Sequence, residues 1–317
     1  MRWTARTCCR DLAVRWDQFS SHSAQAHLGT RVCLLVESAR GRLGSVPVTT
    51  RPTALITGAS SGIGAELARL FAGDSHDLVL VARRARPLED LSAELRERHD
   101  VNVRVFARDL SESASVPDLW DELMAARVQV DALVNNAGVG LYGPVWEQDA
   151  DALDRMVRLN VAALTTFTRL ALPGMVSRHS GKILNLASVV GYQPAGPGMA
   201  AYYATKAYVL SLSKGLALEL KGSGVTVTAL SPGVTASSFE ERSGASGTRL
   251  YRWVPAMSAK AVALAGYRGM MRKKTVVIPG IIAKLFSLAG ELPPRRIALA
   301  VNRWLLKRAG SHGSSSS

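Results

Sequence analysis

Thiols and paired metal ligands are scarce in this sequence. Its 317 residues include three cysteines, Cys8, Cys9 and Cys33, all within the first 51 residues. The rest of the chain therefore offers no thiol for a disulfide bond, a metal site or a nucleophile. The six histidines are scattered, without a His-Glu-x-x-His motif or another paired spacing, so we expect no metal site.

Long hydrophobic runs are also missing. No stretch reaches 18 apolar residues without a charge, and the longest candidate near the C-terminus is the short run 275–283 between Lys274 and Lys284. We therefore expect no membrane-spanning helix. The sequence predicts a cytoplasmic protein; peripheral contact with a membrane and delivery to an organelle by the N-terminal residues both stay open.

The basic residues are concentrated at the two ends of the chain. The net charge is +14, yet residues 52–248 carry 18 basic against 21 acidic side chains. Residues 1–51 have eight arginines against three acids, and residues 249–317 have 13 basic side chains against Glu291 alone. Because the central region is mildly acidic and has no motif of interleaved basic and aromatic residues, the composition argues against a nucleic-acid partner.

Three parts of the chain differ in composition. Residues 1–51 are rich in Arg, Ser and Ala and lack the apolar core of a secretory signal. A transit peptide, a disordered tail and an over-extended start of the reading frame all fit this segment. Residues 52–280 are expected to form one domain, and residues 281–317 a basic amphipathic segment with a disordered tail.

The pattern of residues 52–280 alternates short apolar runs with longer helical stretches. Strands are predicted at about 53–57, 78–82, 102–106, 130–134, 181–187, 225–230 and 274–278. Helices are predicted at about 63–72, 87–98, 113–127, 151–178, 202–220 and 259–270. This alternation predicts an α/β fold: a single doubly wound domain with a seven-stranded parallel sheet and helices on both faces.

A glycine-rich turn joins the first predicted strand to its helix. The segment Thr57-Gly58-Ala-Ser60-Ser61-Gly62-Ile63-Gly64 has the features of a dinucleotide-binding loop. Gly58 permits a tight turn, Gly62 lets the backbone approach a pyrophosphate, and Gly64 allows close helix packing. The following helix N-terminus offers unpaired N–H groups to the anion.

The residues after the next strands indicate which dinucleotide binds. The second strand ends at Arg83 and Arg84, with no acid to hold a ribose 2′-hydroxyl, so a 2′-phosphate and hence NADP(H) is favoured. Asp109 follows the third strand, where an acid can contact adenine. Asn136, Ala137 and Gly138 close the fourth strand beside the expected cofactor groove.

A serine, a tyrosine and a lysine follow the fifth predicted strand. Ser188 comes directly after it, and Tyr202 and Lys206 are spaced i and i+4 on a predicted helix. Such a pair projects from one helix face, so we expect the ammonium to lower the pKa of the phenol. A phenol tuned in this way can exchange a proton near neutral pH.

Taken in order, these motifs resemble the short-chain dehydrogenase/reductase family over about residues 52–280. The resemblance implies a Rossmann-like fold, a homo-oligomer and an NADP(H)-dependent oxidoreductase acting on carbonyl or alcohol carbon. It assigns catalysis to Asn160, Ser188, Tyr202 and Lys206, with Asn160 anchoring a proton-relay water. It adds Pro232, Gly233 and Ser237 to the cofactor contacts, which also include Tyr202 and Lys206; Ser237 replaces a frequent threonine. Tyr203 lies off the face of Lys206, which leaves catalysis to Tyr202.

The substrate is less constrained by the sequence. Residues 234–256 are expected to form the substrate loop, and Phe239, Leu250, Tyr251, Trp253 and Met257 suggest an apolar lid. With the basic segment that follows, they favour a hydrophobic carbonyl, acyl or lipid substrate. A dinucleotide-binding sensor without turnover is the alternative, against which the complete catalytic set argues.

The segment 295–308 is predicted to form an amphipathic helix after Pro293-Pro294. One stripe holds Ile297, Val301, Trp304 and Leu305, and another holds Arg296, Arg303 and Lys307. The apolar stripe could pack on the protein's own core or on a second subunit. The excess of basic residues instead favours reversible contact with anionic lipid, which we expect vesicle binding to reveal.

Overall fold

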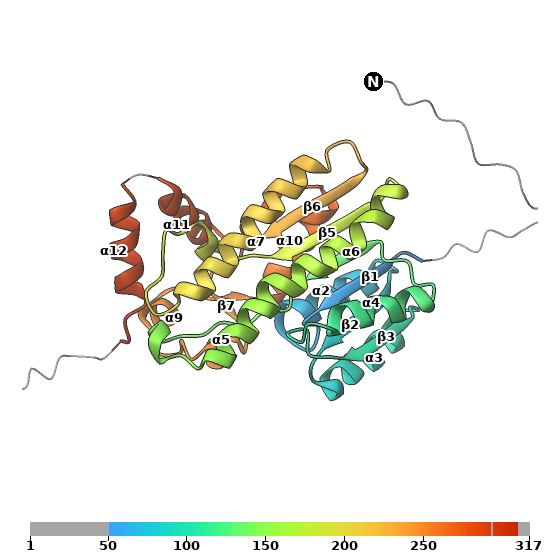
Figure 1. The fold of residues 1–317 in the computed structure, drawn as a ribbon, viewed down its shortest axis with the longest axis horizontal. Coiled ribbons are helices and arrows are strands. Elements are labelled where there is room, and N and C mark those ends of the chain that lie inside the picture. The colour runs from blue at the N-terminus through green and yellow to red at the C-terminus, as the bar shows by residue number, and fades with distance from the viewer. Residues whose placement is uncertain (1–50, 293, 310–317) are drawn as a thin grey trace, which may run out of the picture. The chain divides into compact units, whose positions relative to one another are not determined.

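The computed structural model describes residues 51–292 and 294–309. The N-terminal extension, apart from Arg51, and the C-terminal tail lie outside these residues. The predicted sheet is confirmed (Figure 1): its seven strands are all parallel, in the order β3-β2-β1-β4-β5-β6-β9. The strands are β1 (Thr53–Thr57), β2 (Asp77–Ala82), β3 (Val103–Ala107), β4 (Ala132–Asn135), β5 (Gly181–Leu186), β6 (Val225–Leu230) and β9 (Val276–Val277).

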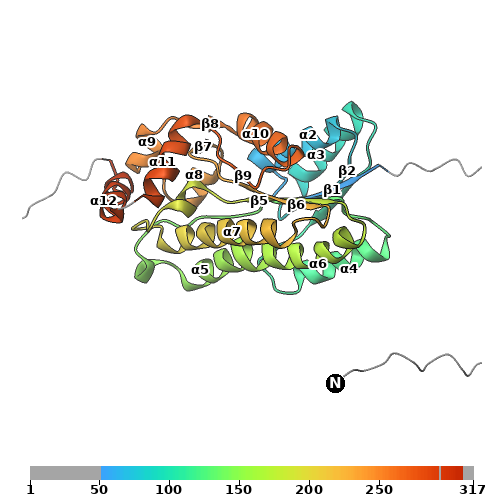
Figure 2. The same cartoon turned by 90° about the horizontal axis from the view of Figure 1, so that it is seen from above.

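Helices cover both faces of the sheet, as Figure 2 shows. One layer contains α2 (Gly62–Gly73), α3 (Ala85–Arg98) and α10 (Ala259–Met271). The other contains α4 (Ser115–Ala125), α5 (Ala150–Val157), α6 (Leu164–Ser177) and α7 (Ala200–Glu219). The described part of the chain is thus a doubly wound α/β domain.

The central strands are apolar on both faces because both faces are covered. In β1, Ile56 packs into the core beneath α2 and α10, while its neighbour Leu55 packs into the core beneath α4 and α6. Leu80 and Val81 of β2 divide in the same way. Alternate side chains of a strand point to opposite faces, so a doubly covered strand reads as an unbroken apolar run.

The longest helical segment runs through α5, a π-helical turn at Arg158–Ala163 (η2) and α6. Its 28 residues, Ala150–Ser177, are long and apolar enough by length and composition to cross a membrane, with a mean hydropathy of 1.2 over an 18-residue window. In this fold α6 instead packs against β4, β5 and α4, with Phe167 fully buried in the core.

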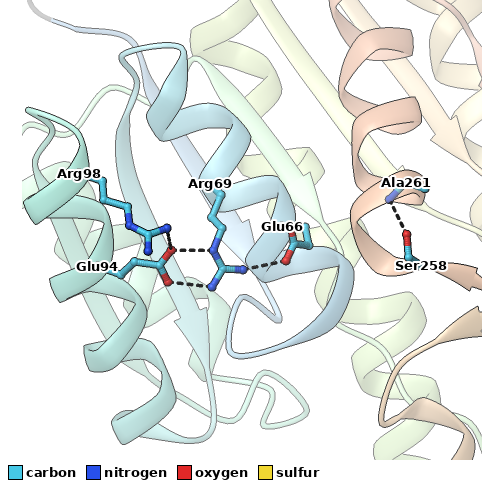
Figure 3. Close-up of polar contacts among 6 residues, drawn as sticks. All are labelled: Glu66, Arg69, Glu94, Arg98, Ser258 and Ala261. Carbon is cyan, nitrogen blue, oxygen red and sulfur yellow. Dashed lines mark hydrogen bonds and ion pairs between the residues drawn. The ribbon is translucent and has the colours of Figure 1, made fainter.

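An ion-pair cluster holds the first two helices together (Figure 3). Arg69 of α2 donates two hydrogen bonds to the carboxylate of Glu94 in α3, at 2.9 and 2.8 Å, and a third to Glu66 at 2.8 Å. The hydrogen bonds from Arg69 lower the pKa of Glu94 below its ordinary value, although burial opposes them. On the other side of α2, the Ser258 side chain caps the N-terminus of α10. The contacts of Arg69 thus fix α2, the helix that follows the glycine-rich turn, against α3.

Several short elements lie beyond β6. They are β7 (Thr235–Ala236), β8 (Met257–Ser258), α8 (Phe239–Ser243) and α9 (Arg249–Trp253). Two more helices, α11 (Ile281–Glu291) and α12 (Arg295–Leu305), end the described chain. The sequence predicted α12 but none of the other five, because they are too short or too evenly apolar to show a clear period. The predicted strand 274–278 is reduced to the two residues of β9.

Candidate active site

The glycine-rich turn lies between β1 and α2, at the carboxyl edge of the sheet. Gly58 and Gly62 have φ angles of +67° and +58°, a region that favours glycine. A Cβ on Gly64 would lie 2.4 Å from the Gly58 carbonyl oxygen, so only glycine fits where helix and turn cross. The turn is therefore built for close backbone approach, as the sequence predicted.

The segment after β4 holds this turn in place. The Asn136 side-chain amide donates to the carbonyl oxygens of Thr57 and Gly58, at 2.9 and 3.1 Å. The Thr57 hydroxyl accepts hydrogen bonds from the backbone N–H groups of Asn136 and Ala137, both at 3.0 Å. Asn136 therefore acts by fixing the turn. Ser61 makes no side-chain cap to α2, which leaves the N–H groups of that helix directed at the groove.

Three arginines gather at the end of the groove next to β2; a fourth, Arg108, also lines the groove but is paired with Glu122. Arg83 and Arg84 are exposed there, and Arg242 of α8 lines the same cavity. Partial burial and the charges of Arg84 and Arg83 lower the pKa of Arg242. Among the described residues, neither Arg84 nor Arg242 forms an ion pair with a carboxylate. Arg83 lies 3.8 Å from Asp109.

Asp109 stands at the same end of the groove. Burial opposes its ionisation, but hydrogen bonds from the Ser111 backbone and hydroxyl, at 2.9 and 2.7 Å, and the charge of Arg83 bring its pKa below the ordinary value. One carboxylate among three guanidinium groups leaves this end of the groove electropositive. Such an end suits a multiply charged anion.

Asn160 lies in the π-helical turn η2. Its side chain is 2% exposed, accepts from the Val139 N–H at 3.0 Å and donates to the Val139 carbonyl at 2.8 Å. It also donates to the Thr205 hydroxyl at 3.1 Å, next to Lys206. A π turn re-aims side chains locally and often occurs at functional sites. Here it places Asn160 where it joins the segment after β4 to α7; the proton-relay water stays a prediction.

Ser188 follows β5 and begins the short 3₁₀ turn η3 (Val189–Tyr192). Its hydroxyl accepts from the Val190 N–H at 3.3 Å and is 3.5 Å from the Pro232 carbonyl. Both contacts are long, so the hydroxyl keeps capacity for a stronger partner. Ser188 lies beside the phenol of Tyr202.

Tyr202 and Lys206 lie on α7 and are buried, with 8% and 4% exposed. The Lys206 ammonium donates to the Leu186 carbonyl at 2.7 Å and lies 5.8 Å from the centre of the Tyr202 ring. Burial lowers the pKa of Lys206 to about 8. The predicted same-face arrangement is confirmed.

The prediction that Lys206 lowers the pKa of the Tyr202 phenol is wrong for the polypeptide by itself. Burial, with a smaller contribution from the nearby Tyr251, raises the pKa of Tyr202; the Ser188 hydroxyl partly offsets this. Desolvation of a phenolate in an apolar site outweighs the attraction of a cation several ångströms away. Tyr202 is therefore a neutral phenol at physiological pH, which is a proton donor.

Tyr203 points away from this pair. Its hydroxyl donates to Asn302 Oδ1 of α12 at 3.2 Å, and its ring fills the space beside Gly196. The assignment of the proton donor to Tyr202 rather than Tyr203 therefore agrees with the geometry.

A cavity of about 570 Å³ connects these groups. All but one of the predicted cofactor contacts line it; the exception, Gly64, lies behind the turn. The lining contacts are Gly58, Ser60, Ser61, Gly62, Ile63, Arg83, Arg84, Asp109, Asn136, Ala137, Gly138, Tyr202, Lys206, Pro232, Gly233 and Ser237. Asn160 and Ser188 do not line it and support the lining residues from behind. No cluster of metal-ligating side chains occurs among the described residues.

The far end of the cavity is apolar. Phe239 packs against the Tyr202 ring with 5.3 Å between ring centres, and Leu250 and Tyr251 lie next to it. Ile282, Phe286 and Leu305 of the two C-terminal helices complete the wall.

Sequence reasoning missed two groups in this cavity. Arg242 had no signal, because a lone arginine in a loop-like segment resembles any exposed cation. The wall from α11 and α12 was missed because α11 was not predicted and because the basic residues favoured lipid contact over packing of the last helix on the domain. Burial of polar Asn302, which is 1% exposed, is what reveals this packing.

The fold and site define a dinucleotide-dependent oxidoreductase with a Ser-Tyr-Lys centre. The sequence profile of the short chain dehydrogenase family matches residues 52–246. The chain belongs to this family, and it is an enzyme of the class that acts on alcohol and carbonyl groups.

Individual relatives have varied activities. Sulfoacetaldehyde reductase 2 of Chromohalobacter salexigens is 38% identical over 216 residues, covering 66% of this chain and 84% of that protein. The very-long-chain 3-oxoacyl-CoA reductase of Anas platyrhynchos is 33% identical over 185 residues, covering 56% and 58%. A short-chain dehydrogenase of Sphingobium yanoikuyae, solved in complex with NADPH, is 37% identical at a TM-score of 0.68, covering 82% and 99%.

Proposed function

We propose that this protein is an NADP(H)-dependent reductase of a hydrophobic ketone or acyl carbonyl. The observation that carries the proposal is one cavity that joins the glycine-rich turn to an apolar chamber, with Tyr202 between the two. The solved relative that binds NADPH supports the cofactor. The 3-oxoacyl-CoA reductase supports an acyl carbonyl.

The residues present fit NADP(H). The turn has no room for a Cβ at Gly64, and the N-terminus of α2 offers N–H groups to a pyrophosphate. Arg83, Arg84 and Arg242 offer cations to a 2′-phosphate, and Asp109 lines the same end, where the adenosine would be held. Lys206, Gly233 and Ser237 line the end next to Tyr202, where the nicotinamide side of the cofactor would be held.

The chemistry divides between the cofactor and the chain. The reduced nicotinamide supplies the hydride for the carbonyl carbon. Tyr202 hydrogen-bonds the carbonyl oxygen and gives it the phenolic proton, so the C=O group becomes CH–OH. Ser188 lies behind the cavity wall and acts through Tyr202, because its hydroxyl hydrogen-bonds the phenol and orients it toward the carbonyl oxygen. Lys206 stabilises the phenolate left on Tyr202, which then regains a proton from solvent.

The apolar chamber determines the substrate class. Phe239, Leu250 and Phe286 line it, and none of the described residues that form its wall at the Tyr202 end is a carboxylate. An apolar chain or ring gains free energy when it leaves water for such a wall, at about 25 cal/mol per Å². A small anionic aldehyde has little apolar surface to bury there.

The sensor alternative predicts cofactor binding without turnover. A neutral phenol, a buried amine and a serine hydroxyl within one site are costly to bury, and binding alone does not require them. A catalytic role explains why the phenol, the amine and the hydroxyl are all present.

A substrate panel with NADPH tests the proposal. Apolar ketones, 3-oxoacyl thioesters, sterol ketones and sulfoacetaldehyde are each followed by loss of the nicotinamide absorbance. We expect the highest kcat/KM for an apolar ketone or an acyl thioester. Preference for sulfoacetaldehyde would overturn the substrate class, and NADPH binding without turnover of any compound would favour the sensor.

A further inference from the structure

The helix α11 presents a row of apolar side chains to solvent. Ile281, Leu285 and Leu288 follow the spacing i, i+4 and i+7 and are 76%, 61% and 53% exposed. Residues at this spacing lie on one helical face. The opposite side of α11, through Ala283 and Ser287, is buried against the domain.

The helix α12 repeats the arrangement. Ile297, Val301 and Trp304 have the same spacing and are 62%, 43% and 44% exposed. Three residues of the stripe expected from the sequence therefore lie on an outer face, whereas the fourth, Leu305, is half-buried and lines the cavity. The inner face is instead formed by Ala298, Asn302 and Leu306, all buried.

These six residues define the C-terminal apolar surface. The two helices contact each other at the end of the molecule farthest from β3, as Figure 1 shows. Trp253 of α9 adds to the surface, with 5.0 Å between its ring centre and that of Trp304. Soluble monomers rarely leave so many large apolar side chains exposed on neighbouring elements unless the region binds something.

Positive charges flank the C-terminal apolar surface. Lys284, Arg296 and Arg303 are exposed on the same two helices, and Lys307 is exposed two residues after α12; none of them pairs with a carboxylate among the described residues. The one acid of these helices, Glu291, lies 3.5 Å from Lys214 of α7 and is thereby neutralised. The region thus combines exposed apolar side chains with exposed cations that have no carboxylate partner among the described residues.

This charge pattern distinguishes between the possible occupants. A second copy related by a two-fold axis would bring the cations of both copies together, which costs free energy. The N-terminal segment of this chain is itself basic, with eight arginines against three acids in residues 1–51. An anionic lipid surface complements both the cations and the apolar side chains.

We propose that the C-terminal apolar surface docks reversibly on anionic lipid bilayers. The surface is also the outer side of the substrate chamber: Ile282 is 56% exposed and lines the cavity, together with Phe286 and Leu305. Docking brings the chamber wall to the bilayer, so an apolar substrate dissolved in lipid reaches Tyr202 without crossing water. This last step rests on the proposed function; the docking does not.

Vesicle sedimentation of the full chain tests the docking. The vesicles are phosphatidylcholine alone and an equimolar mixture of phosphatidylcholine and phosphatidylglycerol. We expect binding to the anionic vesicles that falls as salt is raised, because salt screens the attraction. Equal binding to both vesicle types, or none to either, would overturn the proposal.

Two variants locate the contact while the basic N-terminal segment stays intact. Leu285→Gln/Leu288→Gln and Lys284→Glu/Arg303→Glu are each expected to weaken vesicle binding about tenfold or more. The matched controls Leu218→Gln and Lys221→Glu change exposed residues outside these helices and are expected to bind as the unchanged chain does. Unchanged binding by the two test variants would show that another segment holds the lipid.

Light scattering and activity separate the remaining outcomes. If the unchanged chain does not bind vesicles and Leu285→Gln/Leu288→Gln dissociates its oligomer, the surface is a subunit interface and the proposal fails. A chain that binds anionic vesicles but reduces no hydrophobic carbonyl would overturn the proposed function and leave the docking intact. Thermal melting of each variant confirms that it is folded.

Discussion

The Tyr203 hydroxyl donates a hydrogen bond to Asn302 across 3.2 Å and thereby ties α12 to α7, the helix of the proton donor. Asn302 extends the link, since its amide also donates to Gln193 at 3.0 Å and to the Ala298 carbonyl at 2.8 Å. Gln193 in turn donates to the Phe286 carbonyl of α11 at 2.6 Å. Two adjacent tyrosines thus have separate tasks: Tyr202 faces the cavity, and Tyr203 holds its wall.

Replacement of Asn302 tests this link. Asn302→Ala leaves the Tyr203 hydroxyl and the side-chain oxygen Oε1 of Gln193 buried without a partner. We therefore expect a loss of about 2 kcal/mol in the free energy of unfolding, or local detachment of α12. We also expect the KM for an apolar ketone to rise more than the KM for NADPH. Arg303→Ala, on the exposed side of the same helix, is the control. A melting temperature and both KM values equal to those of the unchanged chain would contradict the link.

Arg242 is expected to set cofactor preference together with Arg83. Arg242→Gln removes one of three cations at the 2′-phosphate end, and we expect kcat/KM for NADPH to fall about tenfold while that for NADH barely changes. Arg83→Asp is expected to reverse or abolish the preference for NADPH. Arg252→Gln, in the neighbouring helix α9, serves as the control. An equal fall for both cofactors would show that Arg242 only supports the lid.

The site shows what sequence can and cannot predict. The glycine-rich turn, Arg83, Asn136, Ser188 and Tyr202 were predictable because parallel strands end at one edge of the sheet, so residues after different strands meet there. Arg242 was not predictable, since the short helix α8 has no periodicity to place it. The α12 pattern correctly indicated a two-faced helix but not its inner face, which packs through Asn302 hydrogen bonds and small Ala298 rather than through its largest apolar residues.

Burial of Lys206 gives a pH dependence of stability. Its pKa is lowered from 10.5 to about 8 in the folded chain, so between these values the unfolded chain binds more protons and folding becomes more favourable as pH rises. Below about pH 8 the full cost of burying the charge applies. Lys206→Met removes this cost, so we expect the variant to have a higher free energy of unfolding than the unchanged chain at pH 7. We expect this difference to shrink by about 1–3 kcal/mol between pH 7 and pH 10. Denaturant unfolding at several pH values measures it, and a constant difference would contradict the assignment.

The ion pairs of Arg69 are expected to matter for the cofactor helix. Arg69→Met leaves Glu94 without its bidentate partner, and we expect a loss of about 1 kcal/mol, since the groups are only partly buried. The pKa of Glu94 is lowered in the folded state, so this stabilisation is present above the ordinary carboxyl pKa and disappears as pH falls below it. Thermal melting of Arg69→Met and of the unchanged chain at neutral and at acid pH measures the loss and its pH dependence. An equal loss of stability at the two pH values would contradict the role of the Glu94 carboxylate.

The central claim is that Tyr202 gives the proton to a carbonyl that NADPH reduces. The most direct measurement is the rate of NADPH oxidation with the best apolar ketone, for Tyr202→Phe and for the matched variant Tyr203→Phe, with NADPH binding measured separately by fluorescence. We predict that Tyr202→Phe lowers kcat by about 100-fold or more with NADPH binding nearly unchanged, and that Tyr203→Phe keeps most of the activity. Full turnover by Tyr202→Phe, or a greater loss in Tyr203→Phe, would contradict the account.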